Sequence, residues 1–380
     1  MILFLLAFFT IYGSIHFYAF NKLRAAFALT APLRAAVILL MIFMLLAPLL
    51  VRISERYGYE STACFLSYAG YIWMGILFLF LATSVLFDLY RLLIYIAIRM
   101  SHSRLSFLIP HPFYLFAAPL IISIFLNVYG YFEAKNIRTE QLAIQTAKIP
   151  PEIGRLRIVQ ISDVHIGMIV RKERLEKIVA AIKQARPDIL VSTGDLLDGQ
   201  IDNMMSFADL FGKIQPQYGK FAVTGNHEFF AGIEQALTFH RQAGFQMLRG
   251  ESLTLANRIS IAGVDDAAGN RSDQYKNAPE EKLLAKLPKE TFTLFLKHRP
   301  NIDRKSRGLF DLQLSGHTHR GQIYPFTLII KLVFPYDSGY FKLSERAHLY
   351  VNRGVGTWGP PIRLLSPPEI TVIDLIHSQD

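Results

Sequence analysis

The chain has 380 residues, of which 52% are hydrophobic and 18% are charged, and its formal net charge at pH 7 is +10. This length predicts one or two globular units. The apolar excess lies in the first third, which indicates a membrane segment joined to a soluble domain and excludes a wholly soluble chain. A basic chain can bind nucleic acid or anionic lipid headgroups, but no Lys/Arg-rich run is interleaved with aromatic residues, so we do not expect a nucleic-acid partner. The single cysteine, Cys64, excludes an internal disulfide.

Residues 1–132 contain four apolar stretches, and each approaches the roughly 20 residues that a transmembrane helix needs. We therefore expect about four spans, at Ile2–Phe20, Ala35–Val51, Tyr68–Phe87 and Phe107–Tyr131, with Leu92–Met100 as a short amphipathic extension of the third. A cleaved signal peptide carries positive residues before its apolar stretch. The first stretch here has none before it, so we expect it to be retained as a helix. His16 lacks a partner at metal-binding spacing and is expected to be a packed residue.

The Lys and Arg residues in the short loops predict the orientation of these spans. Loop one carries Lys22, Arg24 and Arg34, and loop three carries Arg91, Arg99 and Arg104. In loop two, Arg52 and Arg56 are offset by Glu55 and Glu60. Loops one and three are therefore expected in the cytoplasm, which predicts a multi-pass cell-membrane protein with its C-terminal domain on the extracytoplasmic side. The spans hold almost no ionisable residues, which favours an anchor over a transport pathway.

The sequence of the remaining chain predicts a polar linker at 133–152, with Pro150-Pro151 near its end, and an α/β domain at 153–380. The helical spacing of Leu175, Ile178 and Ile182 indicates a helix over Lys172–Gln184. Further helices are expected at Phe207–Ile214 and Gly232–Gln242, and strands at Arg155–Ser162, Asp188–Thr193, Lys220–Thr224, Arg258–Val264, Phe292–Lys297, Asp311–Ser315 and Glu369–Ile376. Strand–helix alternation followed by a strand-rich part predicts one β-α-β sheet with a second sheet packed on it.

Five of these strands are followed directly by motifs that contain Asp, His or Asn. The motifs are Asp163-Val164-His165, Gly194-Asp195, Gly225-Asn226-His227-Glu228, a lone His298, and Gly316-His317-Thr318-His319. Such strand ends can meet at one edge of a sheet, where open α/β sheets place their ligands. Carboxylate, imidazole and amide oxygen without thiolate suit Mn, Fe, Zn or Mg. Two such ions need a bridging ligand, and Asp195 is our candidate. Taken singly, each motif also fits a helix cap, a turn or a structural histidine.

In this order, the motifs resemble those of the calcineurin-like metallophosphoesterases, over roughly the last two-thirds of the chain. The tail from Asn352-Arg353-Gly354 to Pro368-Glu369-Ile370 resembles a membrane-associated bacterial branch of that family. The resemblance implies a four-layer α-β-β-α sandwich. It also implies one metal bound by Asp163, His165, Asp195 and His319, and a second bound by Asp195, Asn226, His298 and His317. His227 is implied beside the leaving group, where it could stabilise transition-state charge or protonate the departing oxygen as a general acid.

Neighbouring residues carry secondary expectations. Asp198 is expected to cap a helix or to support the ligands, Glu228 to orient His227, and Arg299 to contact phosphate or to form a surface salt bridge. The apolar run Phe326–Phe334 fits a core strand or packed loop, or else an apolar flap that holds the chain of a lipid substrate. Gly354, Gly356 and Gly359 predict a flexible loop.

The sequence thus predicts a membrane-anchored enzyme with two divalent ions, Mn, Fe or Zn before Mg, and no organic cofactor. A hydroxide between the ions would attack a phosphodiester, phosphomonoester or pyrophosphate bond, and we expect a lipid-linked or envelope substrate close to the bilayer. The alternative is a membrane sensor or transporter that uses the domain to bind metal or phosphate without turnover. The sequence leaves the oligomeric state open.

Overall fold

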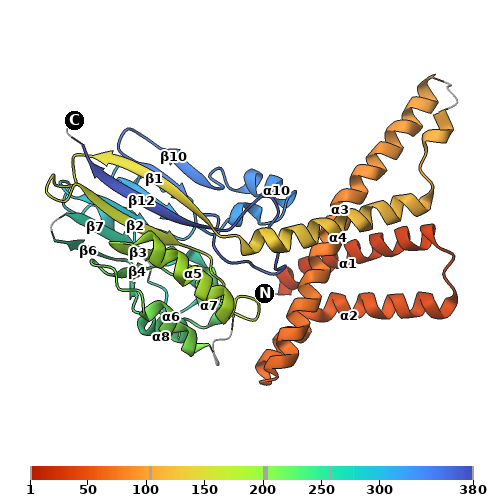
Figure 1. Cartoon of the computed structure of the whole chain (residues 1–380), viewed down its shortest axis with the longest axis horizontal. Coiled ribbons are helices and arrows are strands. Elements are labelled where there is room, and N and C mark those ends of the chain that lie inside the picture. The colour runs from red at the N-terminus through yellow and green to blue at the C-terminus, as the bar shows by residue number, and fades with distance from the viewer. Residues whose placement is uncertain (1, 102–104, 200–203, 257, 277, 379–380) are drawn as a thin grey trace. The chain divides into compact units, whose positions relative to one another are not determined.

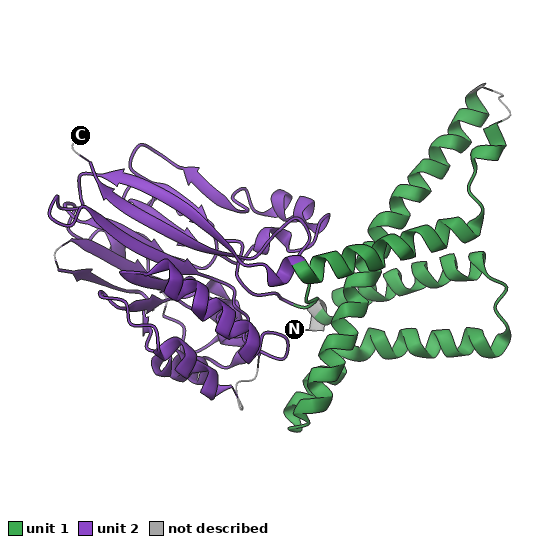
Figure 2. Cartoon of the chain, viewed as in Figure 1, with its two compact units in different colours: residues 1–132, 359–362 green, residues 133–358, 363–380 purple. Residues whose placement is uncertain are grey.

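The computed structural model describes residues 2–101, 105–199, 204–256, 258–276 and 278–378 (Figure 1). These form two compact units (Figure 2). Unit 1 comprises residues 1–132 and 359–362, and unit 2 comprises residues 133–358 and 363–380. Arg104, which contributes to the predicted charge of loop three, lies outside the described residues.

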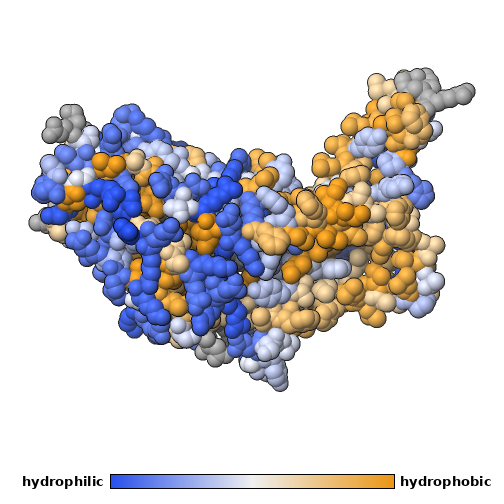
Figure 3. Space-filling view, in the orientation of Figure 1, coloured by the Kyte–Doolittle hydropathy of each residue, from blue (hydrophilic) through white to orange (hydrophobic). Residues whose placement is uncertain are grey.

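Unit 1 consists mainly of long apolar helices, whose surface is largely hydrophobic (Figure 3). They are α1 (Ile2–Ala26), α2 (Ala31–Arg56), α3 (Glu60–Ser101) and α4 (Pro112–Lys135), with a short 3-10 turn at Leu105–Leu108. In the described part of the chain, three helical stretches are long and apolar enough to cross a membrane, namely Ala31–Arg56, Glu60–Met100 and Leu105–Lys135. The first predicted span lies in α1, outside these three, so the count of four stays a prediction. Helix α3 runs unbroken through Leu92–Met100, which is therefore a continuation of the third helix.

Polar side chains inside unit 1 satisfy one another between helices. The Tyr18 hydroxyl donates a hydrogen bond of 2.6 Å to Asp88, which also forms an ion pair with Lys22. His16 is buried, its Nδ1 lies 2.8 Å from a backbone carbonyl of its own helix, and its Nε2 accepts the indole N–H of Trp73 at 3.0 Å. His16 is thus the packed residue that the sequence predicts. Ionisable groups in apolar helices need such partners, because an unpaired polar group there is costly.

Unit 2 contains two six-stranded sheets. The first has the order β1 (Arg138–Thr146), β12 (Glu369–His377), β2 (Arg155–Ile161), β3 (Ile189–Ser192), β4 (Lys220–Ala222) and β5 (Gln246–Met247). The second has the order β10 (Gly339–Lys342), β11 (His348–Val351), β9 (Leu312–Ser315), β8 (Phe292–Leu296), β7 (Ile259–Gly263) and β6 (Glu251–Leu255).

Apolar side chains from both sheets form one shared core, which includes Ile158, Val191, Leu294 and Ile373. The outer face of the first sheet is covered by α5 (Lys172–Ala185), α6 (Met205–Gly212) and α8 (Ile233–Gln242), in a second apolar cluster. A third cluster packs α9 (Glu280–Leu284) on the outer face of the second sheet. The layers therefore run helix, sheet, sheet, helix, which confirms the predicted sandwich.

Residues 133–152 differ from the predicted linker, because they hold strand β1. This strand pairs in parallel with β12, from Arg138 opposite Glu369 to Thr146 opposite His377. Of its nine residues only Ile144 is buried, so β1 is a polar edge strand. Its composition resembles that of a linker because one of its faces and one of its edges are solvated.

The run Phe326–Phe334 is neither a core strand nor a packed loop. Residues Phe326–Val333 form the helix α10, and Thr327 is its only buried residue. A continuous apolar run of this length fits a strand or a helix equally well, because its periodicity does not separate the two.

The five motifs follow strands of both sheets and do not share one edge of a single sheet. Strands β2, β3 and β4 are parallel, so Ile161, Ser192 and Ala222 lie in register at their carboxyl ends. Strands β8 and β9 are also parallel, with Leu296 opposite Leu314. The loops that follow these strands are brought together at one end of the sandwich.

Candidate metal centre

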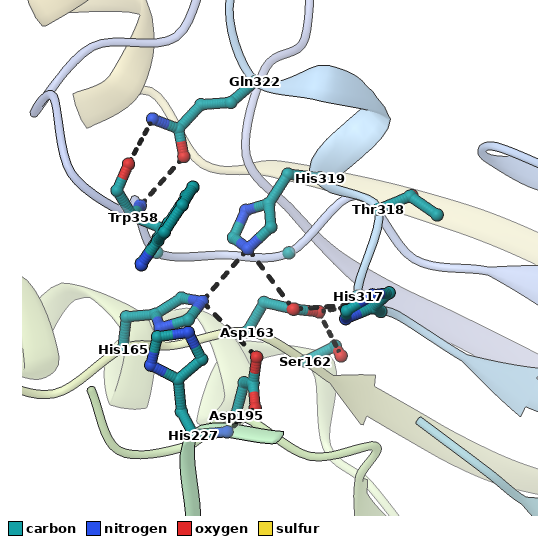
Figure 4. Close-up of polar contacts among 12 residues, drawn as sticks. Ser162, Asp163, His165, Asp195, His227, His317, Thr318, His319, Gln322 and Trp358 are labelled. Carbon is teal, nitrogen blue, oxygen red and sulfur yellow. Dashed lines mark hydrogen bonds and ion pairs between the residues drawn. The ribbon is translucent and has the colours of Figure 1, made fainter. Parts of the chain in front are cut away.

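The first group of side chains comprises Asp163, His165 and His319, whose donor atoms lie within 4.8 Å of one another. Nε2 of His165 lies 3.0 Å from Nε2 of His319, which lies 3.3 Å from Oδ1 of Asp163 (Figure 4). Oδ2 of Asp195 is 3.9 Å from Nε2 of His165. Two imidazole nitrogens and two carboxylates thus surround one small space.

The second group comprises Asp195, His298 and His317, also within 4.8 Å of one another. Nε2 of His298 lies 3.3 Å from Oδ2 of Asp195 and 3.1 Å from Nδ1 of His317. The same Asp195 oxygen therefore faces both groups. Asn226 starts helix α7 (Asn226–Ala231), and its Oδ1 is buried without a hydrogen-bond partner in the described structure. A buried amide oxygen without a partner is costly unless something else binds it, so this atom fits a metal ligand.

The backbone is left-handed at five of these residues. The φ angles are 51° at Asp163, 54° at His165, 52° at Asp195, 74° at His317 and 48° at His319. Non-glycine residues seldom adopt this region, and they do so where the surroundings fix them, often at functional sites. Here Asp163 N–H donates to the carbonyl of Gly194, and His165 N–H donates to that of Asp195.

Glu228 fixes the Asp195 loop and does not orient His227 as the sequence suggested. Its buried carboxylate accepts the backbone N–H groups of Asp195 at 3.0 Å, Leu196 at 2.8 Å, Leu197 at 3.3 Å and Gly225 at 2.7 Å. The last of these bonds also caps the start of α7. Four backbone donors that the loop leaves unpaired are thus satisfied by one side chain.

Asp198 lies beside two histidines, in the supporting position that was one of its two expected roles. Its Oδ1 is 3.3 Å from Nδ1 of His165 and 3.1 Å from Nδ1 of His227. His298 lies with Nδ1 2.7 Å from the carbonyl of Thr193. Contacts of this kind orient the imidazole rings through Nδ1, which leaves Nε2 directed toward the shared space.

The electrostatics keep the carboxylates ionised. Burial raises the pKa of Asp195, but His298 and His227 outweigh it and hold that pKa well below its usual range. Burial lowers the pKa of His298, but Asp195 more than compensates and raises it to about 10. Burial and the neighbouring His298 lower the pKa of His317 to about 3. One proton can therefore lie between His298 and His317, at a place where a bound cation would replace it.

Arg299 forms a salt bridge, with Nε 2.8 Å from Oδ2 of Asp266. The glycine loop is packed, which corrects the expected flexibility at Gly354 and Gly356. Gly356 N–H donates to the carbonyl of Asp163, and a Cβ at Gly356 would lie 1.9 Å from the carbonyl oxygen of Val164.

A fully buried arginine, which the sequence analysis missed, holds this glycine loop on the site. Arg363 donates to the carbonyls of Arg353 and Gly354, and its Nη2 lies 3.1 Å from Nδ1 of His319. No local pattern around Arg363 announces this role, because its partners are backbone carbonyls that the fold brings to it.

His227 packs against two exposed aromatic rings, which the sequence analysis also missed. Its ring centroid is 5.5 Å from that of Phe230 and 6.2 Å from that of Trp358. Gln322 fixes Trp358 by accepting its backbone N–H and donating to its carbonyl, both at 2.9 Å (Figure 4). Phe230 and Trp358 are 61% and 54% exposed, so an apolar rim borders His227.

A matched pair of glycine substitutions tests how closely the loops are packed. A Cβ at Gly316 would lie 1.9 Å from Oγ of Ser162 and 2.3 Å from Oδ2 of Asp163, whereas one at Gly308 would meet nothing within 4 Å. We expect Gly316→Ala to weaken metal binding by about 10–100-fold, the range for lost ligand support. Gly308→Ala should bind metal like the wild type. Calorimetric metal titration of both variants checks this, and equal affinities would show that the loops yield freely.

Comparisons with known proteins place these motifs in a family. A family model described as calcineurin-like phosphoesterase matches residues 156–321. An uncharacterized metallophosphoesterase of Aquifex aeolicus is 38% identical over 67% of this chain and 98% of that protein. An uncharacterized metallophosphoesterase of Helicobacter pylori strain J99 is 34% identical over 68% of this chain and 70% of that protein. A transmembrane protein with metallophosphoesterase domain from Danio rerio is 32% identical over 67% of this chain and 61% of that protein. The chain therefore belongs to the calcineurin-like phosphoesterases, which are metal-dependent hydrolases.

Proposed function

We propose that this membrane protein is an anchored phosphoesterase with a dinuclear metal centre, which hydrolyses phosphodiester, phosphomonoester or pyrophosphate bonds of a lipid-linked or envelope substrate. The observation that carries the proposal is the shared Oδ2 of Asp195, 3.9 Å from Nε2 of His165 in one group and 3.3 Å from Nε2 of His298 in the other. A carboxylate that faces two clusters of donor atoms suits two cations.

The residues fit two divalent ions in number and type. The first would be held by Asp163, His165, Asp195 and His319, and the second by Asp195, Asn226, His298 and His317. Oxygen and imidazole donors suit Mn, Fe or Zn, and also Mg. When bound, the ions would neutralise phosphoryl oxygens and lower the pKa of a water between them. The chain supplies the fixed donor geometry, through Glu228, Asp198 and the strained loops.

His227 is the residue that we assign to the leaving group. Its Nδ1 faces Asp198 at 3.1 Å, so its Nε2 is available to a substrate. Burial lowers its pKa, but Asp195 and Asp198 outweigh this and raise it to about 9. A protonated imidazole can stabilise charge on the departing oxygen or donate a proton to it from Nε2.

Replacing His227 separates turnover from binding. We expect His227→Ala to lower kcat for a chromogenic phosphodiester by about 10²–10⁴-fold, the usual contribution of a general acid. Metal content should stay at the wild-type level, because His227 is not among the seven residues that we assign as metal ligands. Steady-state kinetics with elemental analysis of the same samples measures both. Unchanged turnover would remove the acid role, and a wild-type protein that binds metal but cleaves no ester would favour the sensor or transporter.

We also propose, on the basis of loop charge, that the chain crosses the membrane several times and that unit 2 lies on the extracytoplasmic side. Arg24 lies in the last turn of α1, Arg34 lies near the start of α2, and Arg99 lies in the last turn of α3, so basic residues flank the first and third connections. A reporter fused after Asp380 should therefore be active when it requires export and inactive when it requires the cytoplasm. The reverse pattern would invert the topology.

A further inference from the structure

Helix α10, in unit 2, has several exposed apolar side chains. Leu328 is 52% exposed, Ile329 51%, Leu332 86% and Val333 63%. The helix has no acidic residue, and its only charge is the exposed Lys331. Soluble surfaces seldom expose so many adjacent apolar side chains, and such patches mark contact with another apolar phase.

A pocket lies at the C-terminal end of α10. It has a volume of about 410 Å³, within the range of small-molecule sites. One part of its wall is apolar and includes Ile302, Val333, Phe334, Tyr336 and Leu343. The other part includes Asn301, Arg304 and Arg307, in the segment that follows the metal-centre residue His298.

Two guanidinium groups line this second part. Arg304 and Arg307 are exposed, and neither forms a side-chain hydrogen bond or ion pair with any residue that the structure describes. The nearby Asp303 does not line the pocket, and its Oδ1 accepts the backbone N–H of Lys305 at 3.1 Å. Unpaired guanidinium groups are well suited to bind phosphate oxygens, because their N–H groups match that geometry. The pocket thus combines a cationic and an apolar side.

The pocket borders the metal centre. The ring of Phe334, in the pocket wall, packs edge-on against His317 with centroids 5.5 Å apart. The hydroxyl of Thr318 donates to the carbonyl of Asp337 at 2.5 Å, which ties the Tyr336 segment to the ligand loop. A molecule bound in the pocket would therefore lie beside His317, one of the proposed metal-binding residues.

We infer that this pocket and the outer face of α10 bind a membrane lipid whose phosphate headgroup carries a net negative charge, as the substrate's non-reacting half. Arg304 and Arg307 hold an anionic group of the headgroup, and Val333, Phe334 and α10 contact the hydrocarbon. The inference rests on the proposed function, because it assigns the pocket to the same substrate. It commits to a lipid because the chain is a membrane protein, α10 is apolar without acidic residues, and the unpaired charges are cationic.

The test uses the full chain in micelles of a non-ionic maltoside, stripped of metal so that the metal centre contributes no cations. Calorimetric titration compares dihexanoylphosphatidic acid with zwitterionic dihexanoylphosphatidylcholine and with inorganic phosphate. We expect the phosphatidic acid to bind best, and the double variant Arg304→Gln/Arg307→Gln to bind it at least about tenfold more weakly, since each lost charged hydrogen bond is worth about that factor. Val333→Asn should also weaken binding.

The control removes two exposed cations elsewhere, in Lys213→Gln/Arg241→Gln, and should bind like the wild type. Equal affinity for inorganic phosphate would show that the pocket binds a free anion, and would overturn the inference that it binds a lipid. Equal affinity for the phosphatidylcholine, or an unchanged arginine variant, would remove the role of Arg304 and Arg307. Hydrolysis of a water-soluble phosphodiester by the metal-loaded wild type judges the proposed function separately, because the binding experiment needs no turnover.

Discussion

The substitution Asp195→Asn should abolish metal-dependent hydrolysis, with a loss of at least about a hundredfold, because even partners that only support metal ligands contribute 10–100-fold. The backbone N–H of His227 donates to Oδ1 of Asp195 at 2.9 Å, and an amide oxygen can still accept this bond. The substitution should therefore preserve the conformation of the Asp195 loop. It removes the negative charge and the Oδ2 atom that faces both groups of candidate metal ligands. Hydrolysis of bis(p-nitrophenyl) phosphate and the metal content per chain give the two readouts.

Its matched control is Asp209→Asn, which neutralises an exposed carboxylate that accepts a surface hydrogen bond from Gln242. This variant should hydrolyse the diester at the wild-type rate. If Asp195→Asn kept both its activity and two metal ions, Asp195 would not be the bridging ligand.

The substitution Glu228→Ala should destabilise unit 2 more than any surface change. It leaves four buried backbone N–H groups without an acceptor, and each unsatisfied donor costs about 1–3 kcal/mol, so we expect a total of about 3–5 kcal/mol after relaxation. For a domain of this size, that corresponds to a thermal midpoint lower by roughly 6–20 °C. Thermal unfolding of the metal-free chain, followed by near-ultraviolet circular dichroism, measures it without a contribution from metal binding.

Glu234→Ala is the comparison, since Glu234 is an exposed glutamate on the neighbouring helix α8. It should change the free energy of unfolding by less than about 0.5 kcal/mol. Glu228→Gln should fall between the two, because the amide keeps one acceptor oxygen. Equal midpoints for Glu228→Ala and Glu234→Ala would mean that the Asp195 loop does not depend on this carboxylate.

The sequence predicts the parts of the fold whose signal is local. Strands β2, β3, β4, β8 and β9 are largely apolar runs that are closely followed by Gly, Asp or His, and their burial follows directly from that pattern. Helix α5 is fixed by its apolar spacing and ends just before Pro187. The clustering of the motifs also follows, because parallel strands present their carboxyl ends on the same side.

The remaining features depend on partners far along the chain. Strand β1 looks like a linker until β12 pairs with it over nine residues. Glu228 cannot be assigned from its neighbour His227, because its partners are backbone donors more than 25 residues away. Arg363 and Trp358 join the site through backbone contacts that leave no residue pattern. Helix α10 is ambiguous because its eight residues form a short, mostly apolar run, which fits a strand or a helix.

The most direct test of the central claim is reconstitution of the metal-free full chain with Mn, Fe, Zn or Mg. Hydrolysis of a chromogenic phosphodiester and of its monoester would be followed as each ion is added. A dinuclear phosphoesterase should regain activity in step with about two bound ions per chain. The preferred ester would then narrow the substrate class. Tight metal binding without cleavage of either ester or of a lipid pyrophosphate would contradict the account, and would point to a domain that binds metal without turnover.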